Sequence, residues 1–262
     1  MKPLLTAIVT GASEGLGKAF SVELARRGIN LLMVSLPGTG LNHLSTYLQK
    51  SFDVKADYLE LDLTLQESYT GIFDYLKQNN TTAHILINNV GLGNWDWFID
   101  KSTAFYKTQL ELNVMTPVML TRVFLGQVDD SVTSYILNVG SLGGLFVVPK
   151  KATYGASKAF IAYFTKCMQL ELHGRNVKMS LLSPGGINTK PELLVMNQKL
   201  KGIAAATIFE AEDVARIAID GLFKGKKEIV PGAANKFLVT LNGLLPAFIK
   251  NAIVKRKLKD HG

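Results

Sequence analysis

The chain has 262 residues, of which 47% are hydrophobic and 19% are charged. This composition excludes an intrinsically disordered chain, which combines low hydrophobicity with high net charge. Lys and Arg number 29 and Asp and Glu number 21, so the formal charge is +8. Part of this excess crowds the C-terminus, and no basic stripe is interleaved with aromatic residues, so we expect no nucleic-acid partner.

Cysteine and histidine usage argues against disulfides and metal centres. Cys167 is the one cysteine, so neither an intrachain disulfide nor a thiolate metal cluster is available. The histidines lie far apart and share no ligand spacing, and no metal site is predicted. We expect a reducing, cytoplasmic setting. The apolar start of the chain shows no cleavage pattern, and no apolar run reaches about 18 residues, so no signal peptide or membrane span is predicted.

Short apolar runs alternate with segments of helical length. The predicted strands are Leu4–Val9, Leu31–Val34, Lys55–Glu60, Ile85–Asn88, Ser134–Val139, Lys178–Leu182 and Glu228–Val230. The predicted helices are 15–28, 40–51, 65–78, 102–126, 152–173 and 211–224. Near-continuous apolar strands are typical of a parallel sheet that is covered on both faces. The pattern predicts an α/β fold, a doubly wound parallel sheet of Rossmann type with about seven strands and helices on both faces.

A glycine-rich stretch joins the first predicted strand to the first predicted helix. It reads Thr10-Gly11-Ala12-Ser13-Glu14-Gly15-Leu16-Gly17. Glycines there allow a sharp turn and a close approach to a pyrophosphate, and the helix N-terminus supplies free N–H groups. The spacing differs from the Gly-x-Gly-x-x-Gly fingerprint. A strand before the stretch and a helix after it favour dinucleotide binding over a tight turn that holds no ligand.

Further motifs follow this loop in a fixed order. They are Asn88-Asn89-Val90-Gly91, Asn113, Ser141, Tyr154-Gly155-Ala156-Ser157-Lys158, Ser183-Pro184-Gly185 and Thr189. Together with the loop, the ordered set resembles the short-chain dehydrogenase/reductase family. Val90 departs from the family's usual Asn-Asn-Ala-Gly. The resemblance implies an NAD(P)-dependent oxidoreductase, and it is loosely similar to the hydroxysteroid and long-chain 3-oxoacyl reductase branch.

The candidate catalytic residues are Asn113, Ser141, Tyr154 and Lys158. Tyr154 and Lys158 are four apart and share one face of a helix. A neighbouring ammonium lowers the pKa of a phenol, so Tyr154 is predicted to exchange a proton with a carbonyl or alcohol oxygen. The resemblance implies that Ser141 orients the substrate oxygen, that Lys158 holds the nicotinamide ribose, and that Asn113 holds a water of a proton relay. Taken singly, these residues also fit a surface pair, a turn and a local hydrogen bond.

The resemblance also implies a set of cofactor contacts along the same edge of the sheet. These residues are Gly11, Ser13, Glu14, Gly15, Leu16, Gly17, Ser35, Asp62, Leu63, Asn89, Val90, Gly91, Tyr154, Lys158, Pro184, Gly185, Ile187 and Thr189. Asp62 follows the third strand, where the family's acid contacts adenine. The alternative is that Asp62 caps the helix over 65–78.

The residues after the second strand bear on the choice of nicotinamide. An acid there bonds the ribose 2′-hydroxyl and repels a 2′-phosphate. The stretch Ser35-Leu36-Pro37-Gly38-Thr39-Gly40 contains no acid and no arginine. Glu14 stands where many NADP-dependent relatives have a basic residue, which counts against NADP. Without repulsion from an acid after the strand, NADP(H) is weakly preferred over NAD(H).

The predicted substrate is a small-molecule carbonyl compound or alcohol with an apolar, lipid-like, acyl or steroid-like body. This follows from apolar residues near the site, within 186–210, at Trp95, Trp97 and Phe98, and after Ser141. The alternative is that they pack a lid. An alternative for the whole chain is a catalytically silent dinucleotide-binding regulatory or scaffold protein, which predicts a damaged catalytic set.

Assembly and the tail complete the sequence-based expectations. Helices 102–126 and 152–173 resemble the pair that joins subunits in related proteins, so a homodimer or homotetramer is predicted. We expect a dinucleotide-binding and catalytic unit over 1–232 and an amphipathic helical appendage over 233–262. Its stripe runs from Leu244 to Ile253, with Pro246 in the first turn and lysines beyond. That helix either packs on the protein or makes weak peripheral contact with an anionic membrane.

Overall fold

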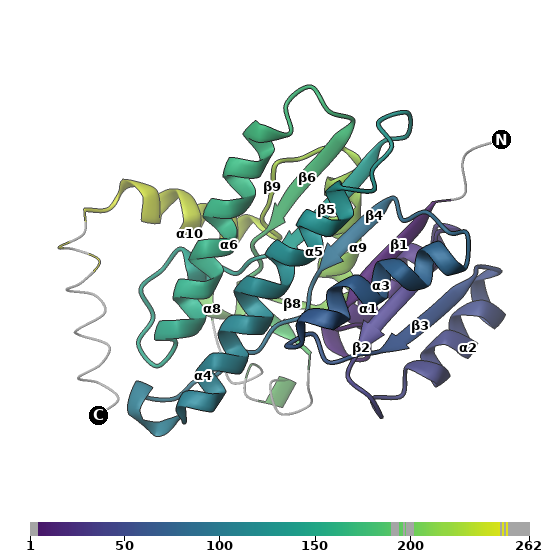
Figure 1. Cartoon of the computed structure of the whole chain (residues 1–262). Helices are drawn as coiled ribbons and strands as arrows, with labels where there is room; N and C mark the ends of the chain where they lie inside the picture. Colours follow the sequence, from purple (N-terminus) through teal and green to yellow (C-terminus); the bar gives the residue numbers. More distant parts are fainter. Residues whose placement is uncertain are drawn as a thin grey trace.

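The computed structural model describes residues 5–189, 194–195, 197, 202–246, 248 and 250. Seven parallel strands form its main sheet (Figure 1), which confirms the predicted fold class. Across the sheet they are β3 (Ala56–Glu60), β2 (Asn30–Ser35), β1 (Thr6–Thr10), β4 (Ile85–Asn88), β5 (Ser134–Val139), β6 (Val177–Leu182) and β9 (Glu228–Ile229). Because every neighbouring pair is parallel, the carboxyl ends of these strands meet at one edge.

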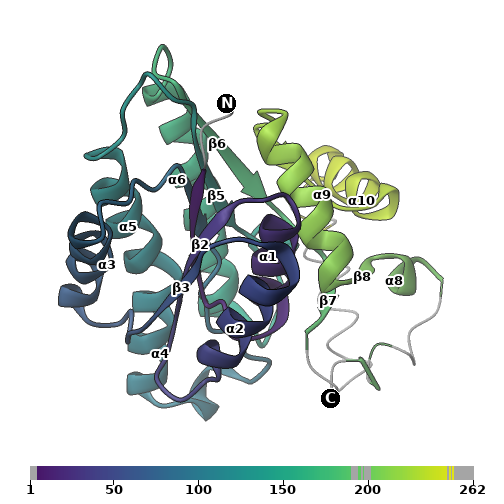
Figure 2. The same cartoon turned by 90° about the vertical axis from the view of Figure 1, so that its right-hand side faces the viewer.

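Helices cover both faces of the sheet, which Figure 2 shows nearly edge on. One face carries α1 (Gly15–Arg26), α2 (Leu41–Phe52) and α9 (Ala211–Phe223), and the other carries α3 (Gln66–Gln78), α5 (Thr116–Leu125) and α6 (Ala152–Glu171). Strand β1 shows why its sequence is apolar throughout. Ala7 and Val9 enter one core cluster, whereas Ile8 enters the opposite one. A strand buried on both faces has no polar side to display.

One predicted helix is interrupted. The segment expected as a single helix over 102–126 comprises α4 (Thr103–Leu110), a π-turn at Glu111–Met115 and α5. Pro117 supplies the physical reason, because it has no N–H and its ring clashes with the carbonyl four residues earlier, that of Asn113. The π-turn therefore falls on a candidate catalytic residue, as such turns frequently do at functional sites.

Several short elements were not predicted individually. They are a two-stranded parallel sheet of β7 (Gly186–Asn188) and β8 (Ile208–Glu210), the helix α8 (Ile203–Ala206), and 3₁₀ turns at Phe98–Asp100 and Leu142–Gly144. Each element spans three or four residues, which is too short for a periodic pattern. They all lie near the carboxyl edge of the sheet or in the segments that follow it.

Helix α10 (Ala233–Leu244) begins the predicted helical appendage and ends where the predicted apolar stripe starts. It is anchored through polar contacts, since Asn235 Nδ2 donates to the carbonyl of Pro231 and Asn242 Nδ2 to that of Leu145. The second contact joins α10 to the turn that follows Ser141. The first part of the appendage is therefore tied to the body of the protein.

The predicted helix beyond Leu244 lies mostly outside the described residues. A further helical hydrogen bond joins the N–H of Lys250 to the carbonyl of Pro246, as expected for a first-turn proline. Both predicted arrangements cover the apolar stripe, yet Leu244 and Phe248 are 77% and 74% exposed in the single chain. Within the described part, the chain contains no helix with the length and hydropathy needed to span a bilayer.

Candidate functional site

The site forms where β1 and β4 lie side by side, the point at which the strand order reverses direction. The Thr10 hydroxyl, at the end of β1, joins the two strands. It donates to the carbonyl of Ile87 and accepts from the N–H groups of Asn89 and Val90, at 3.0 and 3.1 Å. Asn89 Nδ2 returns the contact by donating to the carbonyl of Thr10 at 2.9 Å. In an open α/β sheet, a ligand crevice opens at this place.

The glycine loop takes the conformation that its sequence predicts. Gly11 and Gly15 have φ angles of +63° and +52°, in the left-handed region where side chains cost energy. Gly17 sits against the Gly11 carbonyl so closely that a Cβ would overlap it. These positions bring the loop against Asn89 and open α1 directly toward the crevice. The Glu14 side chain does not cap the helix, so the first N–H groups of α1 suit a phosphate.

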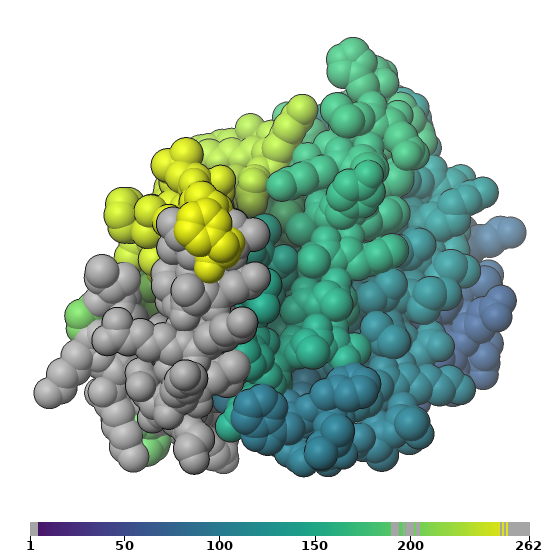
Figure 3. Space-filling view, turned by 90° about the vertical axis from the view of Figure 1, so that its left-hand side faces the viewer, coloured from purple at the N-terminus to yellow at the C-terminus, as the bar shows by residue number. Residues whose placement is uncertain are grey.

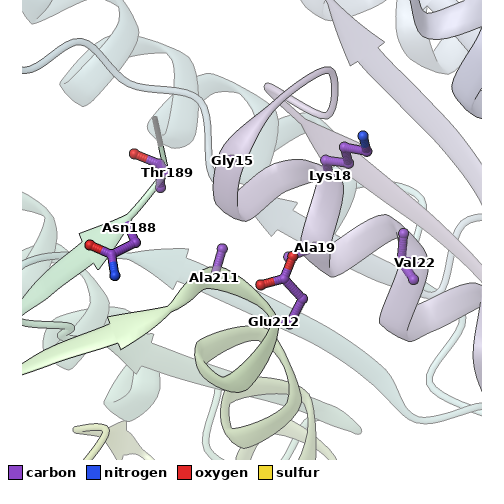
Figure 4. A pocket seen from close by; sticks show the side chains of 8 residues that line it. All are labelled: Gly15, Lys18, Ala19, Val22, Asn188, Thr189, Ala211 and Glu212. Atoms are coloured by element: carbon purple, nitrogen blue, oxygen red, sulfur yellow. The ribbon is translucent and has the colours of Figure 1, made fainter. Parts of the chain in front are cut away.

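A cavity of about 230 Å³ adjoins this loop (Figure 4). Its lining comes from α1, from the end of β7 and from the start of α9, namely Gly15, Lys18, Ala19, Val22, Asn188, Thr189, Ala211 and Glu212. Thr189 faces the loop closely, because a Cβ on Gly15 would lie 3.0 Å from the Thr189 Cβ. Two predicted cofactor residues that are 174 positions apart thus meet across the crevice.

Polar side chains gather around the end of β2, beside the glycine loop. The hydroxyls of Ser13 and Ser35 are 2.8 Å apart, and Thr39 donates its proton to the carbonyl of Leu36. Glu60, at the end of β3, accepts from the N–H of Gly38 at 3.0 Å. Glu60 is thus a carboxylate beside this loop that was not among the predicted residues, although its place at a strand end was a signal.

Asp62 does not cap α3. The helix has Leu65 as its N-cap residue, and Asp62 Oδ1 instead accepts from the N–H and the hydroxyl of Thr64 at 2.9 and 2.8 Å. The capping alternative is therefore wrong in its simple form. The side chains of Leu16 and Leu63 are buried in the core. These two residues can face a cofactor only through their backbone.

The candidate catalytic groups converge at the carboxyl ends of β4 and β5. Helix α6 carries Tyr154 and Lys158, and the Lys158 Nζ lies 5.9 Å from the centre of the Tyr154 ring. The Ser141 hydroxyl lies close enough to the Tyr154 phenol to lower its pKa. The Ser141 Oγ also accepts from the N–H of Gly143 at 3.0 Å, which directs its proton away from that amide. Ser141 and Lys158 thus both lie close to the Tyr154 side chain.

Asn113 is held at the π-turn by both ends of its amide. Its Oδ1 accepts from the N–H of Leu92 at 2.8 Å, and its Nδ2 donates to the Ser157 hydroxyl at 3.0 Å. Ser157 in turn donates to the carbonyl of Tyr154, a positioning contact that was not predicted. Gly91 leaves space here, because a Cβ on it would lie 3.0 Å from Asn113 Oδ1 and 3.5 Å from Lys158 Nζ. Both groups thus border the same small space.

Burial sets the protonation of this cluster. It lowers the pKa of Lys158 from its ordinary 10.5 to about 8, although Nζ donates to the carbonyl of Val139 at 2.8 Å. Burial also raises the pKa of Tyr154, and the hydrogen bond from Ser141 opposes that rise. The prediction that Lys158 lowers the pKa of the phenol stays a prediction, because the net rise seen here reflects burial as its largest cause. The ammonium points at the Val139 carbonyl, and Ser141 is the group that favours the phenolate.

The segment after β6 closes the crevice from the other side. The carbonyl of Pro184 accepts from the N–H of Leu142, which ties this segment to the turn after Ser141. Gly185 has no room for a side chain, because a Cβ would meet Thr207 and the buried Asn235 amide. Of the predicted apolar lip, Leu194 and Val195 are described and exposed, whereas Leu193, Met196 and Leu200 lie outside the described residues.

Comparison with known proteins decides the family. The family model for the short chain dehydrogenases matches residues 5–199. The chain belongs to the short-chain dehydrogenase/reductase family. It is therefore an enzyme, an oxidoreductase, and the resemblance predicted from its motifs is confirmed. Within the described residues, no group of three or more His, Cys, Asp or Glu side chains is placed to hold a metal ion.

Curated relatives are similar at modest identity. Hydroxysteroid dehydrogenase-like protein 1 of Gallus gallus is 29% identical over 247 residues, which cover 93% of this chain and 72% of the relative. The human 17-beta-hydroxysteroid dehydrogenase type 3 is 31% identical over 186 residues. The very-long-chain 3-oxoacyl-CoA reductase of Mus musculus is 29% identical over 70% of this chain. The chain matches only 59% and 60% of the last two relatives.

Solved structures share the fold. A 7beta-hydroxysteroid dehydrogenase superposes with a TM-score of 0.81 at 22% identity, and 96% of each chain is covered. A short-chain dehydrogenase from Sphingobium yanoikuyae, solved with NADPH, gives a TM-score of 0.78 at 24% identity over 92% of this chain and 93% of that one. At these identities the likeness establishes the fold alone.

Proposed function

We propose that this enzyme transfers a hydride between a nicotinamide cofactor and a carbonyl compound or secondary alcohol. The observation that carries the proposal is the cluster of Ser141, Tyr154 and Lys158 at the same sheet edge as the glycine loop. Acid, orienting hydroxyl and cation thus lie beside a helix N-terminus suited to a dinucleotide phosphate. The catalytically silent alternative requires a damaged set, and each member of the set is present.

In this mechanism, Ser141 and Tyr154 act on the substrate oxygen. Both hydroxyls hydrogen-bond to the carbonyl oxygen and align it, and Tyr154 donates its proton as negative charge develops there. Bound nicotinamide supplies the hydride for reduction and accepts it in the reverse direction. The raised pKa of Tyr154 means that the phenol holds its proton at neutral pH, which a proton donor in reduction requires.

Lys158 and Asn113 belong to the proton relay that returns a proton to Tyr154 after it has donated its own. Lys158 would hold the ribose hydroxyls of a bound nicotinamide through its Nζ, which here donates to the carbonyl of Val139. The space at Gly91, which both Lys158 Nζ and Asn113 Oδ1 border, is suited to a water of the proton relay. A Lys158 whose pKa is about 8 gives up and regains a proton readily near neutral pH, which supports this role.

The preferred cofactor in this proposal is NADP(H). Residues 35–40 contain no carboxylate to repel a 2′-phosphate, and Ser13 and Ser35 place two hydroxyls there. Glu60, bound to the N–H of Gly38, is the neighbouring charge that acts in the opposite direction. A comparison of kcat/KM for NADPH and NADH tests the choice, and a tenfold preference for NADH contradicts it.

We propose an apolar substrate, of the lipid, acyl or steroid class. Trp95, Trp97 and Phe98 are each half or more exposed beside the catalytic cluster, and Val147 is 68% exposed on the opposite loop. The names of the curated relatives, hydroxysteroid dehydrogenases and 3-oxoacyl-CoA reductases, support the same class.

A screen of purified enzyme tests the function. NADPH and NADH oxidation is followed at 340 nm against a panel of ketones and aldehydes, with steroid, acyl and small polar members. Tyr154→Phe keeps the ring but removes the proton, so we expect a loss of about 10²–10⁴-fold in kcat with little change in cofactor affinity. Turnover by Tyr154→Phe at the wild-type rate would refute the mechanism.

Assembly and location are part of the proposal. Figure 3 shows the face on which α6 is exposed. Along α6, Phe160, Tyr163 and Leu170 are 47%, 74% and 71% exposed. Such apolar exposure supports a homodimer or homotetramer, which light scattering at micromolar concentration tests. We place the enzyme in the cytoplasm, with its C-terminal helix either packed on protein or in weak contact with anionic membrane. Sedimentation with anionic vesicles, compared with a chain ending at Asn242, separates the two.

A further inference from the structure

Two lysines reach across the entrance to the catalytic cluster and lie on aromatic rings. Lys151, at the start of α6, has its Nζ 4.7 Å from the centre of the Trp95 ring and 5.4 Å from that of Tyr154. Lys150 has its Nζ 4.8 Å from the centre of the Trp97 ring. One ammonium thus stands between an exposed tryptophan and the reactive phenol, and a second stands next to it.

The backbone holds this arrangement in an unusual conformation. Lys150 has a φ of +67°, in the left-handed region that a lysine rarely adopts. Its carbonyl accepts from the N–H of Asp96 at 3.1 Å, which ties the loop before α6 to the loop that carries Trp95 and Trp97. A non-glycine residue in such a conformation persists only where surrounding contacts impose it, and these positions cluster at ligand sites.

The charges of these two ammonium groups are not balanced by an ion pair. A third lysine nearby, Lys101, forms an ion pair with Asp96 at 3.2 Å. In the described ranges no carboxylate forms an ion pair with Lys150 or Lys151. Burial also lowers the pKa of Lys151, which reflects its partial removal from water. Contact with a ring stabilises a cation but leaves its charge in place. The entrance therefore presents two positive charges at the side of the substrate oxygen.

We propose that Lys150 and Lys151 bind an anionic group of the substrate, a carboxylate or a phosphate, while Trp95 and Trp97 pack on its apolar body. This inference rests on the proposed function, because it takes the group reduced beside Tyr154 to belong to the same molecule. It narrows the substrate class from apolar ketones in general to apolar ketones that carry a carboxylate or a phosphate group. An ammonium between two rings is suited to such a ligand, because a charge-assisted bond gains strength where water is partly excluded.

Binding can be measured without turnover. Trp95 and Trp97 are the two tryptophans of the chain, so its tryptophan fluorescence reports on this entrance. We would titrate the full-length enzyme with decanoate, decyl phosphate and uncharged decanamide, none of which carries a reducible ketone. Isothermal titration calorimetry follows any probe that leaves the fluorescence unchanged. Wild type should bind at least one of the anions about tenfold or more tightly than the amide, and added salt should weaken that preference.

Variants then assign the effect to the two lysines. Lys150→Met/Lys151→Met should bind the anions and the amide equally, and the corresponding double arginine variant should restore the preference. Lys101→Met is the matched control, because it removes a neighbouring lysine that already has a carboxylate partner. Equal affinities for anions and amide in wild type, or a preference that survives the double Met substitution, would overturn the proposal. A carboxylate-only or phosphate-only preference identifies the group.

A kinetic comparison separates this inference from the proposed function. Turnover of a 3-oxo acid should exceed that of its methyl ester through a lower KM, and the double Met variant should remove that difference. If neither ketone is reduced while the anion preference in binding remains, the proposed function fails and the anion site stands. If both are reduced with equal KM and the probes bind alike, the anion site fails and the function stands.

Discussion

Lys158 makes the free energy of unfolding rise with pH. A lysine whose pKa is raised by an ion pair has the opposite effect. Its pKa is lowered by burial from 10.5 to about 8, so the folded protein releases this proton more readily than the unfolded chain. Between these two values the unfolded chain binds more protons, and the free energy of unfolding therefore rises with pH. Below pH 8 both states are charged, and the protein bears the full cost of burying the ammonium.

The substitution Lys158→Met removes that cost together with the charge. Relative to this variant, the free energy of unfolding of the wild-type apoenzyme should rise by about 1–2 kcal/mol from pH 7 to pH 9, and by roughly 2–3 kcal/mol by pH 10. In melting temperature, the change by pH 9 is about 3–5 °C for a protein of this size. At pH 7 the variant should be as stable as wild type or more stable, because losing a buried charge offsets the loss of the donor to the Val139 carbonyl.

Urea unfolding at pH 7, 8, 9 and 10 measures the difference between wild type and variant. Lys166→Met is the matched control, because Lys166 is an exposed lysine on the same helix. The wild-type minus Lys158→Met difference should climb with pH, whereas the wild-type minus Lys166→Met difference should stay flat. A flat difference for Lys158→Met would show that the residue is not a buried cation in the folded apoenzyme, and the reasoning about its protonation would fail.

Three further substitutions test the site. Gly91→Ala puts a methyl group against Asn113 Oδ1 and Lys158 Nζ, so kcat should fall about tenfold or more with a larger solvent isotope effect, and an unchanged kcat contradicts this. Ser141→Ala removes the bond that opposes the raised pKa of Tyr154, so the pH profile of kcat/KM for alcohol oxidation should move to higher pH; an unmoved profile contradicts this. Glu60→Gln removes a carboxylate beside the ribose loop, so the NADPH-to-NADH ratio of kcat/KM should rise several-fold, and an unchanged ratio places Glu60 away from the 2′-phosphate.

The side-chain pattern predicted the sheet, because a strand that is buried on both faces has a continuous run of apolar residues. Strands such as β4 (Ile85–Asn88) and β5 (Ser134–Val139) match their predicted bounds, since a short apolar run between polar turns is typical of a buried strand. The interruption at Asn113 is harder to predict from the sequence, because the residues on either side of it are compatible with one continuous helix. Its signal was Pro117, which cannot donate to a carbonyl four residues back.

The candidate site was predictable in its membership and less so in its electrostatics. Motif order indicated Ser141, Tyr154 and Lys158 together, and they do converge. The direction of the Tyr154 pKa was not accessible from spacing, because it depends on depth of burial and on the point at which the Lys158 ammonium is aimed. Glu60 and Lys151 were missed for a related reason. Each reaches the site from a segment whose sequence carries no motif.

The π-turn at Glu111–Met115 rotates α4 about the helix axis relative to α5. An α-helix turns by about 100° per residue, so one extra residue in the turn rotates all of α4 relative to α5 by that angle. Removing one residue from 111–115 would restore regular α-helical hydrogen bonding. It would also rotate Gln109 away from Leu92, to whose carbonyl the Gln109 Nε2 now donates. The irregular helix thus has a role in the site, because a regular one would direct the side chains of α4, Gln109 among them, away from it.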